Sequence, residues 1–149
     1  MKKNNKKKGF TLIELLAVIV ILAIIMVIAV PQILNVINDS RKKSWDNSMK
    51  LVGEAVELAI TTSSFGSDNF TLTTCTDETT CADMQTKIFD RADISPDDYV
   101  LKSISKNSND NYVITMDAAT GGQFASISDY INDSTKPHNT VTINAGSIN

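Results

Sequence analysis

The feature that most constrains the fold is an apolar run of 21 residues, Phe10 to Val30, in which only Thr11 and Glu14 are not apolar. A helix of that length, at about 1.5 Å per residue, reaches roughly 30 Å and can cross the hydrocarbon core of a bilayer. The remaining residues, 31–149, are rich in Ser, Thr, Asn and Asp and can build only a modest core. The sequence therefore predicts a small domain on a membrane-spanning stem.

Charge is divided along the chain in the same way. A basic leader, residues 1–9, holds five lysines and no acidic residue, and all 17 acidic residues follow it. By the positive-inside bias, this leader predicts a cytoplasmic N-terminus and an exported C-terminal part. Without the leader, 9 of the 14 basic residues remain against 17 acidic ones, a net charge of −8. We therefore expect no nucleic acid among the partners of the exported domain.

A secretory signal peptide is one alternative for this segment, because it also begins with lysines and an apolar region. That region normally has about 7–15 residues and ends at a small-residue cleavage site. Here the run has 21 residues and no Ala-x-Ala pattern, although Val27-Ile28-Ala29 is a weak candidate site. A plain single-span anchor is a second alternative. Neither explains Glu14, because a carboxylate inside a membrane span costs on the order of 3 kcal/mol.

Glu14 needs a cationic partner, and no Lys, Arg or His lies between Lys8 and Arg41. A backbone amine would supply the charge if the chain were cut before Phe10. That amine and Glu14 would stand at positions i and i+4 of a helix, one above the other. The amine could pair with Glu14 of its own chain or of a neighbouring copy. A protonated Glu14 without a role is the alternative.

The stretch from Lys6 to Leu15, which reads KKKGFTLIEL, resembles the prepilin motif of type IV pilins and pseudopilins. The match continues through the apolar tract to about residue 35. The resemblance implies that a prepilin peptidase cuts the Gly9–Phe10 bond on the cytoplasmic face and that Phe10 becomes the N-methylated first residue. It further implies that Glu14 pairs with the Phe10 amine of an adjacent subunit when a filament assembles.

The resemblance also implies partners and a location. The partners are further copies of the chain in a homopolymeric filament, a prepilin peptidase/methyltransferase, an inner-membrane assembly platform with its ATPase, and membrane lipid before assembly. Nucleotide is used by that ATPase, so we expect no cofactor in this chain. The chain would begin as a single-pass precursor in the cell membrane and end in an extracellular pilus on the bacterial surface.

Beyond the apolar run, residues 31–62 are expected to continue the helix in amphipathic form. Pro31 removes one backbone hydrogen bond, which predicts a kink or local opening useful in assembly, with a simple helix terminator as the alternative. Helical periodicity resumes after it and favours the kink. An apolar stripe recurs there at three-to-four-residue spacing and is expected to pack on a C-terminal sheet. The stripe consists of Trp45, Met49, Val52, Val56 and Ala59/Ile60.

Residues 63–98 are expected to form a loop region with one short amphipathic helix around residues 82–91. Cys75 and Cys81 bracket five residues of this region. In an exported domain a disulfide between them is plausible, and two free thiols are the alternative.

Residues 99–149 change to alternating apolar and polar runs separated by turn-rich connections, which predicts an antiparallel β-sheet. The expected strands are Tyr99–Ser105, Tyr112–Ala118, Phe124–Tyr130 and Thr140–Asn144. A long helix packed on a small antiparallel sheet is an α+β fold, which is also the architecture that a pilin would have.

No catalytic or metal-binding pattern is visible in the sequence. His138, the only histidine, stands beside Pro137 in a turn and is expected to be a surface residue without a role. We therefore expect no enzyme and no metal site. The function predicted is a structural subunit of a type IV pilus. The alternatives are a pseudopilin of a type II secretion or competence (DNA-uptake) apparatus and, less favoured, a membrane-anchored binding module. Cell adhesion and twitching motility both stay open as roles of such a filament.

Overall fold

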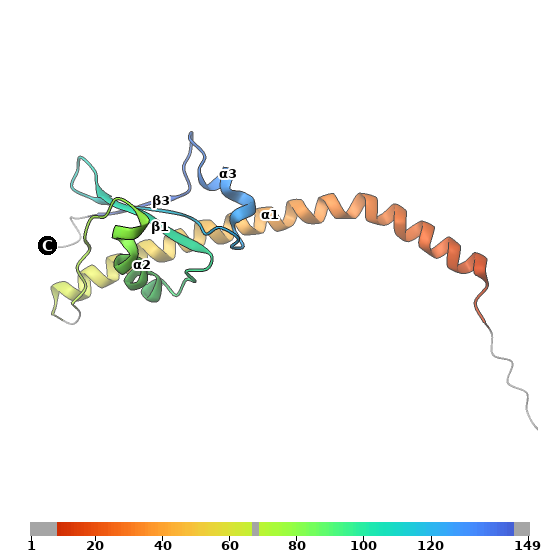
Figure 1. Ribbon diagram of the computed structural model, residues 1–149, viewed down its shortest axis with the longest axis horizontal. Helices are drawn as coiled ribbons and strands as arrows, with labels where there is room; N and C mark the ends of the chain where they lie inside the picture. Colours follow the sequence, from red (N-terminus) through yellow and green to blue (C-terminus); the bar gives the residue numbers. More distant parts are fainter. Residues whose placement is uncertain (1–8, 67–68, 145–149) are drawn as a thin grey trace, which may run out of the picture. The chain divides into compact units, whose positions relative to one another are not determined.

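A computed structural model describes residues 9–66 and 69–144 of the chain. The elements are α1 (Leu12–Ser64), α2 (Glu78–Ala92), β1 (Tyr99–Lys106), β2 (Tyr112–Ala118), the 3₁₀ helix η1 (Ala125–Ile127), α3 (Ser128–Ile131) and β3 (Thr140–Ile143) (Figure 1). The predicted α+β class, a long N-terminal helix packed on a small antiparallel sheet, is confirmed. Of the basic leader predicted at residues 1–9, all but Gly9 lies outside the described residues.

The chain divides into two compact units, Met1–Ile37 and Asn38–Asn149. We call residues 12–37 of α1 the stem and the described residues of the second unit the head. Every large apolar side chain of the stem is exposed, from 40% at Ile37 to 82% at Leu12. By length and composition, α1 is able to span a membrane.

Pro31 lies inside α1, which continues as a helix on both sides of it. The alternative that Pro31 terminates the helix is therefore wrong. Because proline has no backbone N–H, the helix lacks one of its ladder hydrogen bonds at this point. The kink or opening expected there stays a prediction.

The core of the head is built on the C-terminal part of α1. The stripe predicted from its spacing is buried, with Trp45, Val52 and Val56 at 0% exposure, which confirms the prediction that these residues form a packing face. The Trp45 ring stacks on Tyr99 of β1 at 5.3 Å between centroids and meets Phe124 edge-on at 5.4 Å. This aromatic group joins α1, the sheet and the segment after β2 in one core.

The sheet has three antiparallel strands in the order β1-β2-β3. The register pairs Ile104 with Ile114 across the first two strands and Ile114 with Val141 across the last two. On the outer side of β1, the Gln85 side chain of α2 accepts a hydrogen bond from the Leu101 N–H at 2.9 Å. The helix therefore covers part of an edge that would otherwise expose unpaired backbone groups.

The strand predicted at Phe124–Tyr130 is wrong. The segment forms η1 and α3 instead, so the sheet has three strands rather than four among the described residues. The buried side chains are Phe124, Ile127 and Ile131, which recur every three to four residues. That spacing belongs to a helical turn and not to a strand, whose inward side chains recur every two residues.

The helix predicted at residues 82–91 begins earlier, at Glu78. The loop expected to precede the helix therefore ends at Asp77. A capping box starts the helix, because Thr80 donates its backbone N–H to the Asp77 carboxylate at 2.9 Å and the Asp77 N–H is within 3.2 Å of the Thr80 hydroxyl. The spacing Asp-x-x-Thr marks the start of a helix. The apolar residues of the segment alone do not indicate this start.

Gly53 of α1 lies against Val141 and Ile143 of β3. A Cβ atom at this position would stand 2.9 Å from Cγ2 of Val141, a β-branched side chain with little freedom to rotate away. We expect Gly53→Ala to lose about 1–3 kcal/mol through overpacking and to regain about 1 kcal/mol through helix propensity. Thermal unfolding of the chain in detergent, followed by Trp45 fluorescence, measures the net loss.

Glu54→Ala is the matched control, because Glu54 is the next residue of the helix and its side chain is exposed. This control should shift the unfolding midpoint little. A Gly53→Ala chain as stable as the parent would contradict the requirement for glycine at this contact.

Candidate processing and assembly site

The N-terminal turn of α1 is closed by a reciprocal pair of hydrogen-bonding residues. The backbone N–H and the hydroxyl of Thr11 both donate to Oε2 of Glu14, at 2.8 and 2.9 Å. The N–H of Glu14 points back to the Thr11 hydroxyl oxygen at 3.3 Å. This arrangement is a capping box, in which the first turn satisfies backbone donors that have no partner within the helix.

Sequence reasoning missed this local role of Glu14, although the spacing Thr11-Leu12-Ile13-Glu14 is the signal for it. The cap uses only one carboxylate oxygen. In the described part of the chain, Oε1 of Glu14 accepts no hydrogen bond and the carboxylate has no cationic partner within ion-pair distance. The carboxylate is thus held in place while half of its acceptor capacity remains open.

Gly9 and Phe10 lie just before the helix, in backbone without regular structure. The Phe10 side chain is 93% exposed, and no heavy atom stands within 4 Å of the position that a Cβ on Gly9 would take. The bond between these two residues is therefore accessible from several sides.

The two cysteines form a disulfide in the head. Cys75 and Cys81 are joined with their Cα atoms 5.3 Å apart, and both side chains are buried. Cys75 also exchanges two backbone hydrogen bonds of 2.9 Å with Ile104 of β1. The bond thus links the segment beside β1 to the first turn of α2.

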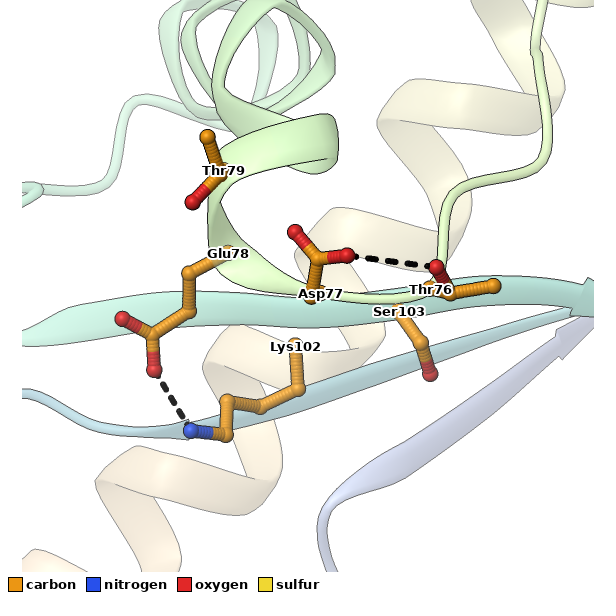
Figure 2. Close-up of a pocket in the computed structure, with 6 residues that line it drawn as sticks. All are labelled: Thr76, Asp77, Glu78, Thr79, Lys102 and Ser103. Atoms are coloured by element: carbon orange, nitrogen blue, oxygen red, sulfur yellow. Dashed lines mark hydrogen bonds and ion pairs between the residues drawn. The ribbon is translucent and has the colours of Figure 1, made fainter.

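A shallow cleft of about 510 Å³ lies beside this disulfide (Figure 2). Figure 2 shows Glu78 facing Lys102, whose Nζ donates to Oε1 at 2.5 Å and whose pKa is raised chiefly by that bond. Asp77 accepts the Thr80 N–H, which is the main reason that its pKa is lowered. The charged groups of the cleft are therefore already engaged, Glu78 and Lys102 with each other and Asp77 with the first turn of α2.

The structure corrects the expectation that His138 stands alone in a surface loop. Its Nδ1 is 3.0 Å from Oδ1 of Asp46 on α1, and its ring stacks on Tyr130 at 3.9 Å. Tyr130 donates its hydroxyl to Oδ2 of Asp46 at 2.6 Å, and the Trp45 indole donates to the backbone carbonyl of His138 at 2.8 Å. The four residues fasten the segment between α3 and β3 to α1, which is a structural role.

Within residues 9–66 and 69–144, no group of three or more His, Cys, Asp or Glu side chains is placed to hold a metal ion. The residues predicted for processing and assembly fall in two parts of the molecule. Gly9 and Phe10 lie just before α1, Glu14 lies in its first turn, and Pro31 lies further along the stem. The cysteine pair belongs to the head.

Among the described residues, one helix is long and apolar enough to span a membrane, and a small α+β head follows it. Residues 4–30 match the family model of the prokaryotic N-terminal methylation motif, the signature of type IV pilins and pseudopilins. The chain thus carries the pilin-like motif that the sequence resemblance indicated. No curated protein and no solved structure matches the chain.

The cluster around Asp46 predicts a pH dependence of stability. Burial, and then the hydrogen bond to Asp46, raise the pKa of Tyr130 to about 12. The unfolded chain has a tyrosine pKa of about 10, so this contribution to stability is complete below about pH 10 and is lost as the pH rises towards 12. Tyr130→Phe should therefore lower the free energy of unfolding by about 1 kcal/mol at pH 8 and by less at pH 11.5.

Urea unfolding at both pH values measures the difference between variant and parent. Tyr112→Phe is the control, because among the described residues the Tyr112 hydroxyl makes no hydrogen bond. If Tyr130→Phe lowers the free energy of unfolding equally at pH 8 and pH 11.5, ionisation of the Tyr130 hydroxyl does not contribute to the pH dependence of stability.

Proposed function

We propose that the chain is the precursor of a structural subunit of a type IV pilus, cut at Gly9–Phe10, N-methylated at Phe10 and polymerised through its stem. The observation that carries the proposal is the methylation motif at residues 4–30 joined to a stem whose large apolar side chains are all exposed in the single chain. Water cannot cover such a surface without a large free-energy cost. Lipid covers it before assembly, and neighbouring copies cover it afterwards.

The position of Glu14 supports a role in assembly. Thr11 occupies Oε2, so the new amine of a cleaved Phe10 can bind Oε1 without breaking the cap. The cap also fixes the rotamer of the carboxylate before the amine arrives, which reduces the entropy lost on pairing. Inside an apolar bundle, a carboxylate without its partner costs roughly 3–5 kcal/mol. Glu14 therefore selects the axial register in which each copy meets an amine.

The proposal includes the machinery that such a subunit needs. A prepilin peptidase/methyltransferase processes the chain at the cytoplasmic face, and an inner-membrane platform with an ATPase extracts it from the bilayer. The precursor spans the cell membrane once, with its N-terminus in the cytoplasm, and the filament lies on the bacterial surface. Pseudopilins share the motif, so the abundance of this chain in filaments sheared from cells distinguishes a pilus subunit from a pseudopilin of a secretion or DNA-uptake apparatus.

Processing is tested on protein purified from the native cell envelope. Intact-mass and N-terminal peptide measurements should place the first residue at Phe10, with one additional methyl group. Gly9→Val should leave the precursor uncut, because a branched side chain then stands beside the cleaved bond. Among the described residues, no heavy atom stands within 4 Å of a Cβ at position 9, so this substitution meets no neighbour there. A mature N-terminus at Met1, or one at Val30 after a signal-peptidase cut, would refute the proposed processing.

A pair of variants separates the charge of Glu14 from its capping role. Glu14→Gln keeps an oxygen that can accept from Thr11 but removes the negative charge, and we expect filament yield to fall at least about tenfold. Thr11→Val removes the hydroxyl that accepts the Glu14 N–H, which costs about 1 kcal/mol in the isolated helix, and keeps the charge. Filaments are counted by electron microscopy of sheared material. Equal losses in the two variants would mean that capping, not pairing with an amine, is what assembly requires.

A further inference from the structure

The head begins with three consecutive basic residues of α1, Arg41, Lys42 and Lys43. They follow an uncharged stretch of the same helix, residues 15–38, after only Asp39 and Ser40. As a helix that stretch rises about 36 Å, whereas the hydrocarbon core of a bilayer is about 30 Å thick. When the stem spans a bilayer, the three basic residues therefore lie at the level of the phospholipid headgroups.

Arg41 and Lys42 contact other residues of the head and keep their charge. Nη1 of Arg41 donates to the Ser126 hydroxyl at 2.7 Å, and this partner is neutral. Nζ of Lys42 lies 3.7 Å from a carboxylate oxygen of Asp39 and 5.4 Å from the centre of the Tyr130 ring. The Asp39 side chain is 70% exposed, so water and salt weaken this ion pair. Both basic groups therefore remain able to attract an anion.

Lys43 makes no contact of this kind. Its side chain is exposed, and within the described part of the chain it takes part in no hydrogen bond, ion pair or ring contact. The nearby Asp46 carboxylate already accepts a hydrogen bond from the Tyr130 hydroxyl and lies 3.0 Å from Nδ1 of His138. The packing of the head therefore does not explain a lysine at position 43.

Charge is unevenly divided within the head. Residues 38–50, which we call the base, hold four basic and two acidic residues, whereas residues 51–149 hold five basic and 14 acidic ones. The net charges are thus +2 and −9. The segment that contacts the base, residues 125–139, adds Asp129, Asp133 and Lys136, and the sum of base and segment is still +1. An anionic surface therefore attracts the base and repels the rest of the head.

The place of the basic residues runs against the positive-inside bias. That bias favours basic residues on the cytoplasmic side, where the leader holds five lysines, and disfavours them directly after the span. Topology thus gives no reason for the group, and packing gives none for Lys43. An anionic surface at the level of the headgroups accounts for both observations. We propose that Arg41, Lys42 and Lys43 bind the anionic phospholipid headgroups of the leaflet that faces the head.

This inference rests on the proposed function, because only a stem that spans a bilayer before assembly brings the base to the headgroups. The attraction is short-ranged, since salt screens it over about 10 Å at 0.1 M. Lys50 stands seven residues beyond Lys43 on the same helix, about 10.5 Å further from the headgroups. Its charge should therefore contribute little. The contact holds the precursor head upright on the membrane and is broken when the chain leaves the bilayer.

The test measures lipid preference with Trp45, the only tryptophan of the chain, as the fluorescence donor. The full chain is reconstituted in phosphatidylcholine vesicles with a trace of either phosphatidylglycerol or phosphatidylcholine that carries an acceptor dye on its acyl chain. Stronger energy transfer to phosphatidylglycerol reports its enrichment around the chain. We expect Lys43→Gln to lower this preference about fivefold at low salt, the factor that one basic residue contributes at an anionic surface.

Lys50→Gln is the matched control, with the same change of charge at another exposed position of the helix, and should alter the preference less than about twofold. Lys43→Arg should behave as the parent does, because it keeps the charge. The leader is present in every variant, so its lysines contribute equally to each measurement. Lys43→Gln should also keep the thermal unfolding midpoint of the head, since the side chain has no contact to lose.

The outcomes separate the inference from the proposed function. Equal transfer to both lipids in the parent, or equal losses from Lys43→Gln and Lys50→Gln, overturn the lipid contact and leave the pilus proposal intact. Fewer filaments from Lys43→Gln with an unchanged lipid preference would assign the lysine to a contact between copies, which also overturns the inference. Absence of filaments from the parent chain, with Phe10 unprocessed, would instead refute the proposed function.

Discussion

Two apolar surfaces share the single helix α1, and the chain buries only one of them. In the head, Trp45 and its neighbours at helical spacing are enclosed by the sheet and the segment after β2. In the stem, side chains of the same apolar kind remain exposed. Burial of apolar area is the main favourable term in folding, at roughly 25 cal/mol per Å², so the head has its own source of stability and the stem has none within the chain. Whatever covers the stem determines where the protein resides.

The first turn of the stem shows how one residue can serve both the monomer and an assembly. Thr11 and Glu14 cap the helix through a single carboxylate oxygen. A helix that enters a bilayer has unsatisfied donors at its N-terminus, and a cap made by its own side chains reduces that cost. The same cap leaves a negative charge that is expensive in lipid until a cation arrives. Cleavage before Phe10 would create that cation without disturbing the cap.

The parts of this fold that the sequence predicted are those encoded by long local patterns. The Trp45 stripe repeats over four turns of helix, and the hairpin strands of β1 and β2 alternate over seven residues or more. Phe124–Tyr130 is as long as β2 but is helical, because its buried side chains, Phe124 and Ile127, are three residues apart and Phe124 packs edge-on against Trp45. The contact of His138 with Asp46 spans 92 residues of sequence and leaves no local signal. The capping role of Glu14 did have a local signal, which is its spacing of three residues from Thr11. The charge of Glu14 by itself does not indicate this role.

In a polymer of this chain, the proposed pairing of Glu14 with a Phe10 amine would constrain sliding between helices more than rotation. A carboxylate and an amine at the end of a stem fix how far one helix slides past another, since a shift of one turn, about 5.4 Å, separates the pair. They fix rotation about the helix axis poorly, because both groups lie near one end and a hydrogen bond tolerates some reorientation. The exposed apolar side chains of the stem, which neighbouring copies would cover in a filament, are the part of the chain that could fix this rotation.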